Sequence, residues 1–188
     1  MRTLKAGAFI RRFTARDGRE VTLRAPRWSD LDDMLEFINS LVEEGAEIMA
    51  TEKKTREEEV DWLSQHLSAL EKGEKMAIAA EVDGRFVGQV EVRPRSGYSR
   101  HVGVLGIAIS DGYRDIGVGT ELMREAETQA RGLGMEIMTL EVFASNGRAR
   151  HLYEKLGYRV VGREPKAILK DGAYIDNIIM AKELGEDQ

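Results

Sequence analysis

The stretch that most constrains the fold of this chain is VGVLGIAISDGYRDIGVGT, residues 102–120. Its first part, Val102–Ile109, is apolar and rich in β-branched residues, which predicts a buried strand. Ser110–Tyr113 predicts a turn, and a helix is expected to begin near Gly117 and to end at Gly132. A strand that enters a helix through a glycine-bearing turn leaves the first N–H groups of the helix unpaired at its positive end. The stretch therefore predicts a site for an anion, above all a phosphate.

Two features of this turn favour close contact with a phosphate-bearing ligand. Gly117 and Gly119 lack a Cβ atom, so a ligand can approach the backbone, and Arg114 adds a positive charge. The turn does not match the common nucleotide motifs, because no Lys-Ser/Thr pair follows a glycine and no third glycine completes a dinucleotide fingerprint. On this stretch alone, a turn that only caps a helix stays an open alternative.

The segment ISDGYRDIGVG, residues 109–119, resembles motif A of the GNAT N-acetyltransferase superfamily, whose core is (Gln/Arg)-x-x-Gly-x-(Gly/Ala). In that family the turn amides hold the pyrophosphate of acetyl-coenzyme A, and the preceding strand pairs its backbone with the pantetheine arm. The resemblance implies that acetyl-coenzyme A is the acyl donor. It implies donor contacts from Ile107, Ala108, Ile109, Arg114, Asp115, Ile116, Gly117, Val118, Gly119, Thr120, Asn146 and Tyr153.

A second block, Leu140–Tyr158, reads LEVFASNGRARHLYEKLGY and is similar to another recurring GNAT block. In that block a strand ends at Asn, and a short helix carries Leu-Tyr-Glu-Lys-x-Gly-(Phe/Tyr). The resemblance implies that Asn146 contacts the pantetheine arm and that Tyr153 protonates the leaving thiolate. The alternatives are that Asn146 caps the helix and that Tyr153 belongs to an apolar helix face.

The acyl acceptor must lose a proton, and the sequence offers two carboxylates for this step. A primary amine with a pKa near ~10.4 is almost wholly protonated at pH 7, and making it neutral costs about 4–5 kcal/mol. Many relatives carry a Glu on the strand that corresponds to Val102–Ile109, but this strand has none. Glu141 and Glu91, on neighbouring expected strands, are the candidate catalytic bases. A solvated or salt-bridged carboxylate is the alternative for each, and a water-mediated or base-free reaction also fits the sequence.

The amino-acid composition argues against several kinds of binding site and partner. Its 188 residues are 42% hydrophobic and 32% charged, which is typical of a globular protein. The absence of cysteine excludes disulfides, thiolate zinc sites and a cysteine nucleophile, and we expect no metal. No apolar run suits a membrane span or a signal peptide, so we expect a cytoplasmic location and no membrane partner. The net charge of −5 argues against a nucleic-acid partner and suits a cationic amine.

The other segments predict alternating strands and helices. Ser29 is expected to cap a helix that ends at Gly45, and a capping box at Thr55–Glu58 is expected to open a helix that ends at Gly73. Strands are expected at 20–24, 76–82, 86–92, 137–143, 158–163 and 174–181, and a short helix at 148–156. Because a helix joins the strands at 102–109 and 137–143, these two strands are expected to be parallel.

These elements and the resemblance predict an α/β protein with a mixed α+β sheet and a GNAT-like fold. The central sheet is expected to be twisted and mostly antiparallel, with one parallel, splayed strand pair and about four flanking helices. We expect a single domain over residues 1–188, with an N-terminal arm or extra strand at 1–18 and a polar tail at 185–188.

The resemblance implies an N-acetyltransferase that moves an acetyl group from acetyl-coenzyme A directly to a primary amine. The acceptor would be a small molecule or a protein or peptide N-terminus. Glu44, Glu47 and Glu52 could attract a cationic acceptor, although a solvated acidic face is the simpler explanation. The alternative function is a non-catalytic module that binds or senses acyl-coenzyme A, and a homodimer is compatible with either function.

Overall fold

The computed structural model describes residues 4–185, so the expectations for residues 1–3 and 186–188 lie outside the described part. The strands in that part are β1 (Phe9–Thr14), β2 (Glu20–Arg24), β3 (Met76–Val82), β4 (Arg85–Pro94), β5 (Val102–Ile109), β6 (Ile137–Phe143), β7 (Arg159–Lys170) and β8 (Ala173–Glu183). The helices there are α1 (Leu31–Glu43), α2 (Arg56–Glu71), α3 (Val118–Gly132) and α4 (Gly147–Lys155), with short 3₁₀ helices η1 (Trp28–Asp30) and η2 (Gly97–Ser99).

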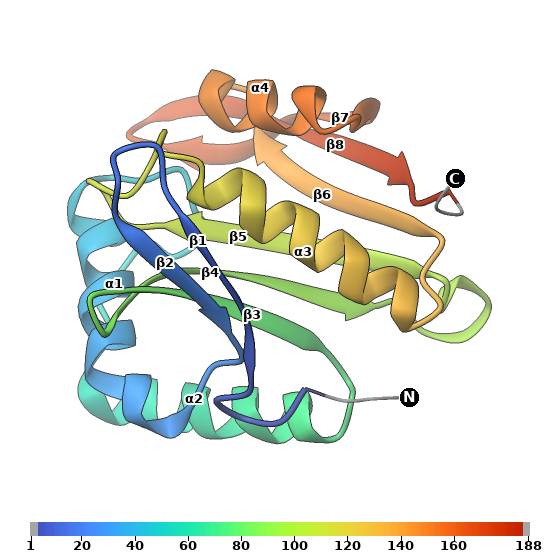
Figure 1. The fold of residues 1–188 in the computed structure, drawn as a ribbon. Coiled ribbons are helices and arrows are strands. Elements are labelled where there is room, and N and C mark those ends of the chain that lie inside the picture. The colour runs from blue at the N-terminus through green and yellow to red at the C-terminus, as the bar shows by residue number, and fades with distance from the viewer. Residues whose placement is uncertain (1–3, 186–188) are drawn as a thin grey trace. The chain divides into compact units, whose positions relative to one another are not determined.

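Within the described residues, the strands form an eight-stranded sheet in the order β1-β2-β3-β4-β5-β6-β8-β7 (Figure 1). Most neighbouring strands are antiparallel, whereas β5 and β6 are parallel, with Val102 opposite Ile137 and Leu105 opposite Leu140. The predicted mixed α/β class, the mostly antiparallel sheet and the parallel pair are therefore confirmed.

The backbone groups into two compact units. Of the described residues, the first unit comprises 4–92 and Ile107–Ala126, and the second comprises Arg93–Gly106 and 127–185. The strand β5 and the helix α3 each contribute residues to both units. The single domain expected from the sequence stays a prediction, and each unit is described by itself below.

In the first unit, Asp-Gly turns join antiparallel strands. Gly18, between β1 and β2, has a φ of 89°, and Asp83 and Gly84, between β3 and β4, have φ values of 51° and 80°. Such left-handed positions are typical of tight hairpin turns. The helices α1 and α2 lie side by side (Figure 1). They share a core with this sheet, which contains Leu31, Met34, Phe37, Leu41, Leu63, Ala79 and Phe86.

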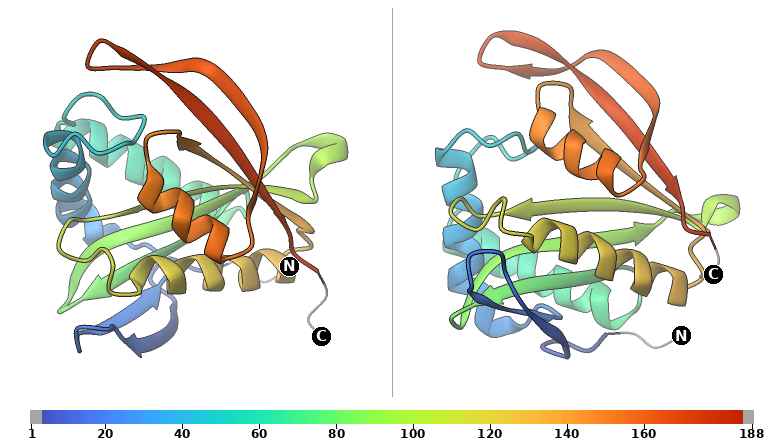
Figure 2. Two further views of the ribbon diagram at one scale, coloured as in Figure 1. Left: turned by 90° about the horizontal axis from the view of Figure 1, so that it is seen from above. Right: turned by 45° about the horizontal axis from the view of Figure 1, so that its top comes forward.

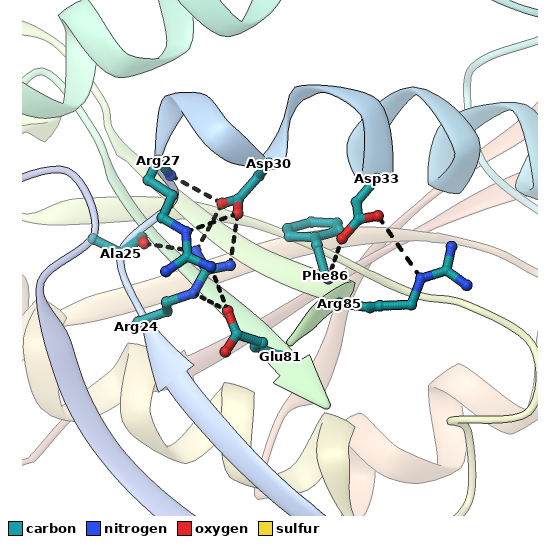
Figure 3. A network of polar contacts seen from close by, with 8 residues as sticks. All are labelled: Arg24, Ala25, Arg27, Asp30, Asp33, Glu81, Arg85 and Phe86. Carbon is teal, nitrogen blue, oxygen red and sulfur yellow. Dashed lines mark hydrogen bonds and ion pairs between the residues drawn. The ribbon is translucent and has the colours of Figure 1, made fainter. Parts of the chain in front are cut away.

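The start of α1 differs from the prediction, because Asp30 rather than Ser29 is its N-cap. Ser29 lies inside η1, so helical winding begins at Trp28, before the expected cap. The Asp30 carboxylate accepts the Arg27 N–H at 2.9 Å and binds the buried Arg24 guanidinium at 2.6 and 2.7 Å (Figure 3). This ion pair holds the chain in its helical turn, and the sequence spacing alone does not reveal it.

The start of α2 agrees with the prediction. The Glu58 N–H donates to the Thr55 hydroxyl oxygen at 3.2 Å, and the Thr55 N–H donates to the Glu58 carboxylate at 2.8 Å. These two bonds are the predicted capping box. The Thr55 N–H and the Thr55 hydroxyl both donate to the Glu58 carboxylate and lower the pKa of Glu58.

In the second unit, β8 lies between β6 and β7, and β7 is longer than predicted. The sequence indicated an end near Arg163, but the strand continues across Pro165 through an irregular register between Glu164 and Ile168. The Asp176 carboxylate stabilises this irregularity, because it accepts the Arg163 Nε–H at 2.5 Å and the Lys166 N–H at 2.8 Å. The result is a long β7–β8 hairpin (Figure 2).

Candidate functional site

The predicted strand, turn and helix form at the expected residues, and the turn between strand and helix lies in the first unit. β5 ends at Ile109, α3 begins at Val118, and Gly117 between them has a φ of 102°. The Glu121 N–H donates to Gly117 O at 3.1 Å, so the N–H groups of residues 118–120 precede the first helical hydrogen bond. A Cβ atom placed on Gly117 would meet nothing within 4 Å. The turn is therefore open at the point where unpaired amides begin the helix.

The β1–β2 hairpin supports this turn. The Arg16 N–H donates to Ile116 O at 2.9 Å, and the Arg19 guanidinium donates to Gly112 O at 2.6 Å. The same guanidinium lies over the Tyr113 ring, 4.5 Å from its centroid. No local pattern predicts these contacts, since the two segments lie far apart along the chain.

Arg114 does not point freely away from the turn. Its Nε donates to Ile109 O at 2.7 Å, and its two terminal nitrogens bind the Glu44 carboxylate, one of them at 3.2 Å. The charge that the sequence places beside the turn is therefore paired with a carboxylate from the end of α1. Glu44, considered above as an attractor of a cationic acceptor, is engaged in this pair.

A glycine that sequence reasoning missed sets the spacing between β4 and the end of β5. A Cβ atom on Gly88 would lie 2.7 Å from Ala108 O and 3.0 Å from the Ile109 Cα. Only glycine permits this close approach of two backbones. An isolated glycine inside a predicted strand is the sequence signal that could have revealed it.

The predicted donor-binding residues fall into both units. The residues from the end of β5 to the start of α3, 107–120, lie in the first unit, and Asn146 and Tyr153 lie in the second. Ile107, Ala108 and Ile109 are partly buried, and Asp115 has a positive φ of 61°.

In the second unit, the residues expected to act on the thioester end of the donor lie on or beside α4. Asn146 is the N-cap of α4, and its side-chain oxygen accepts the Ala149 N–H at 3.0 Å. Tyr153 is buried, and its ring centroid lies 6.2 Å from that of Tyr158. Burial raises the pKa of Tyr153 to about 12, so its phenol is protonated at neutral pH.

Glu141, the first candidate base, belongs to a polar group on three strands of the second unit. The Asn177 side-chain amide donates to Glu141 at 2.8 Å and to Glu164, also at 2.8 Å. Asn177 is buried, whereas both carboxylate residues are exposed. Sequence reasoning missed Glu164 and Asn177, although a polar Asp-Asn pair inside the apolar strand β8 was a visible signal.

Glu91, the second candidate base, takes part in an ion pair in the first unit. Its carboxylate lies 3.2 Å from Lys75 Nζ and 3.7 Å from His66 Nδ1. Lys75 and His66 are both buried, and Lys75 also contacts His66 Nδ1. This is the salt-bridged alternative considered above, and a catalytic role for Glu91 stays a prediction.

Comparison with known proteins identifies the family. Residues 36–158 match the model of the Acetyltransferase (GNAT) family, which covers both blocks singled out in the sequence. The chain belongs to the GNAT acetyltransferase family. It is therefore an acyltransferase, as the resemblance implied.

Two relatives are similar to this GNAT protein in sequence, and one solved structure is similar to it in fold. The chain is 33% identical over 127 residues to the L-amino acid N-acetyltransferase AaaT of Escherichia coli (strain K12), covering 65% of this chain and 76% of that protein. It is 27% identical over 157 residues to an N-alpha-acetyltransferase of Sulfurisphaera tokodaii, covering 78% and 85%. A phosphinothricin acetyltransferase from Sinorhizobium meliloti, solved with AcCoA, shares the fold with a TM-score of 0.77 at 20% identity, over 88% of this chain and 89% of that one.

No helix in residues 4–185 combines the length and the apolar character that crossing a membrane requires. The cytoplasmic location stays a prediction.

Proposed function

We propose that this protein transfers the acetyl group of acetyl-coenzyme A to the α-amino group of an amino acid, an amino-acid analogue or a peptide N-terminus. The structural observation that carries the donor part of the proposal is the open turn at Gly117, which precedes the unpaired amides of residues 118–120. When bound, acetyl-coenzyme A supplies an acetyl group activated as a thioester. Transfer forms a nitrogen–carbon bond, breaks the carbon–sulfur bond, and moves one proton from the amine to the sulfur.

The turn fits the diphosphate of the donor in charge and in shape. The N–H groups of residues 118–120 and the helix dipole of α3 favour an anion. Gly117 adopts a backbone conformation that residues with a side chain rarely adopt. Because glycine has no side chain, the surface beside these amides stays open. The peptide groups of Ile107–Ile109 would hold the pantetheine arm as an added strand would.

The acceptor class rests on the names of the relatives and on chemistry. The relatives reported above act, by their names, on L-amino acids or on N-alpha groups. These acceptors share an α-amino group on a carbon that also bears a carbonyl or carboxyl carbon. An α-amino group in a peptide has a pKa of about 8, so its neutral form costs less to reach than that of a lysine-like amine.

Tyr153 is the proposed proton donor for the leaving sulfur. Its pKa of about 12 keeps the proton on the phenol until charge develops on the sulfur. A thiol has a pKa of about 8.5, so complete proton transfer from this phenol to a thiolate would be uphill by about 5 kcal/mol. We therefore expect Tyr153 to donate a hydrogen bond to the developing thiolate and to pass its proton to the sulfur only as the carbon–sulfur bond breaks. The phenol then regains the proton that the amine releases.

Glu141 is the proposed base, because its carboxylate is exposed and is held by Asn177 rather than by a cation. Glu91 is instead proposed to serve the structure through Lys75. Removing Glu141 should slow acetylation most at low pH, where little of the acceptor is neutral.

The test is mass spectrometry of purified protein mixed with acetyl-coenzyme A and a panel of amino acids, amino-acid analogues, peptides with free N-termini, polyamines and aminoglycosides. We expect acetylation of the α-amino compounds and a reduction of kcat of about 10²-fold or more in Tyr153→Phe. Tyr158→Phe is the matched control, since it also removes a buried phenol of the second unit. Acetylation of polyamines or aminoglycosides alone would contradict the acceptor class. Tight binding of acetyl-coenzyme A without turnover of any amine would favour the sensing module.

A further inference from the structure

Arg114 is held from two sides inside the first unit. Its Nε donates to the last carbonyl of β5, Ile109 O, at 2.7 Å, and its terminal nitrogens bind both oxygens of Glu44. This fork-to-carboxylate arrangement fixes the plane of the guanidinium. Asp111 lies 4.0 Å from Nη1 and its side chain is 84% exposed, so it adds little constraint.

Glu44 approaches Arg114 from a rigid support. It is the C-cap of α1, and its N–H bonds Ser40 O at 2.9 Å. The preceding turns of α1 are anchored by the buried side chains of Phe37 and Leu41. The carboxylate is therefore presented from a fixed helix end rather than from a free loop.

The ion pair between Arg114 and Glu44 reduces the positive charge and the number of N–H donors that Arg114 can offer to an anion. Three of the five N–H donors of an arginine are directed here at protein acceptors, and the positive charge is offset by Glu44. The attraction of the turn for a phosphate must then come mainly from the amides of residues 118–120 and the dipole of α3. What the pair supplies is the fixed direction of the Ile109 carbonyl, where β5 enters the turn.

We infer that Glu44 is a positioning residue for the donor-binding turn and acts through Arg114. The inference rests on the proposed function, because it takes coenzyme A as the ligand of the turn. Glu44 orients the guanidinium, the guanidinium holds the Ile109 carbonyl, and the turn is thereby set before the ligand arrives. Preorganisation of this kind strengthens binding by reducing the ordering that binding would otherwise require.

The experiment measures the Kd of coenzyme A by isothermal titration calorimetry for the wild type, Glu44→Ala, Arg114→Lys and the double variant. If Glu44 positions the turn through Arg114, Glu44→Ala and Arg114→Lys should each raise the Kd by about tenfold, although the lysine keeps the charge. The double variant should bind no more weakly than either single variant, because both substitutions disrupt the same Glu44–Arg114 interaction. Glu43→Ala is the matched control: its carboxylate pairs with exposed Lys53, and its Kd should equal that of the wild type.

A direct role of Arg114 in phosphate binding predicts a different effect of Glu44→Ala on the Kd of coenzyme A. If Arg114 were a direct phosphate ligand that Glu44 merely competes for, Glu44→Ala would bind coenzyme A as tightly as the wild type or more tightly, and this would overturn the inference. Melting curves of the unliganded variants separate lost binding from lost folding, and Glu44→Gln, which keeps one acceptor oxygen, should then give an intermediate Kd. Failure of the wild type itself to bind coenzyme A would instead contradict the proposed function.

Discussion

At the scale of single residues, the least exposed charges of the first unit form one connected group. Arg24 and Asp30 are 3% and 2% exposed, and Arg24 also binds Glu81 at 2.7 Å (Figure 3). Such a group is costly to break, since removal of one partner leaves an uncompensated buried charge. Burial and hydrogen bonding to both carboxylates hold the Arg24 guanidinium in place in the folded state.

Asp30→Asn is expected to lower the free energy of unfolding by about 3–5 kcal/mol, because it leaves the buried Arg24 charge without its main partner. Urea denaturation followed by circular dichroism measures this change. Asp32→Asn is the control, since Asp32 pairs with Arg56 where both side chains are largely exposed, and such pairs contribute about 0–1 kcal/mol. Equal losses in the two variants would contradict the distinction.

The pKa of Tyr153 predicts a dependence of stability on alkaline pH. Unfolded tyrosine ionises near pH 10, whereas folded Tyr153 keeps its proton up to about pH 12. Its contribution is therefore fully present below pH 10 and is lost as the pH rises from about 10 to 12, by a total of about 3 kcal/mol.

Tyr153→Phe removes this contribution and tests it directly. The difference in unfolding free energy between the wild type and the variant should shift against the wild type between about pH 10 and pH 12. Tyr158, whose pKa is raised mainly by burial and by Glu127, is present in both proteins, so most of its effect cancels. A difference that is constant with pH would show that the Tyr153 phenol ionises alike in both states.

At the scale of elements, backbone spacing is set where β4 meets the end of β5. Gly88 lies against Ala108 and Ile109, and a side chain there would meet backbone rather than a flexible side chain. The same stretch of β5 carries the peptide groups that are proposed to hold the pantetheine arm. The spacing of these two strands therefore affects both the fold and the proposed site.

Gly88→Ala is expected to destabilise the protein by about 1–3 kcal/mol and to weaken binding of coenzyme A, because its Cβ would lie 2.7 Å from Ala108 O. Thermal melting and calorimetric titration measure the two effects. Gly162→Ala in β7 is the control, since its Cβ would meet only the Ile179 side chain, at 3.3 Å, which can adjust. A Gly88→Ala variant that melts and binds like the control would disprove the steric argument.

At the scale of the whole molecule, two continuous elements link the compact units. β5 and α3 both contribute residues to each unit, so neither unit can unfold alone without breaking a strand and a helix. This connectivity supports the expectation of a single domain. It also predicts that unfolding is cooperative.

Both tryptophans, Trp28 and Trp62, belong to the first unit, which makes this prediction measurable. Tryptophan fluorescence reports that unit, whereas far-ultraviolet circular dichroism reports the helices and strands of both. We expect the two signals to give the same midpoint and slope in a urea titration. Separate midpoints would show that the units unfold independently.

The sequence by itself determined most local structure and the family. Val102–Ile109, Ile137–Phe143 and the Thr55–Glu58 capping box were predictable because apolar periodicity, glycine turns and caps act between neighbouring residues. The glycine turn and the Asn–Tyr block were readable for the same reason, since each is a short, contiguous motif.

Only the tertiary structure decided the partners of the charged and polar side chains. Arg114 meets Glu44 across 70 positions of sequence, and Glu141 meets Asn177 across 36. Strand register and helix placement bring such residues together, and no local pattern encodes either. For the same reason, the N-cap of α1 is Asp30 and not the predicted Ser29. The position of Asp30 is set by its ion pair with the buried Arg24.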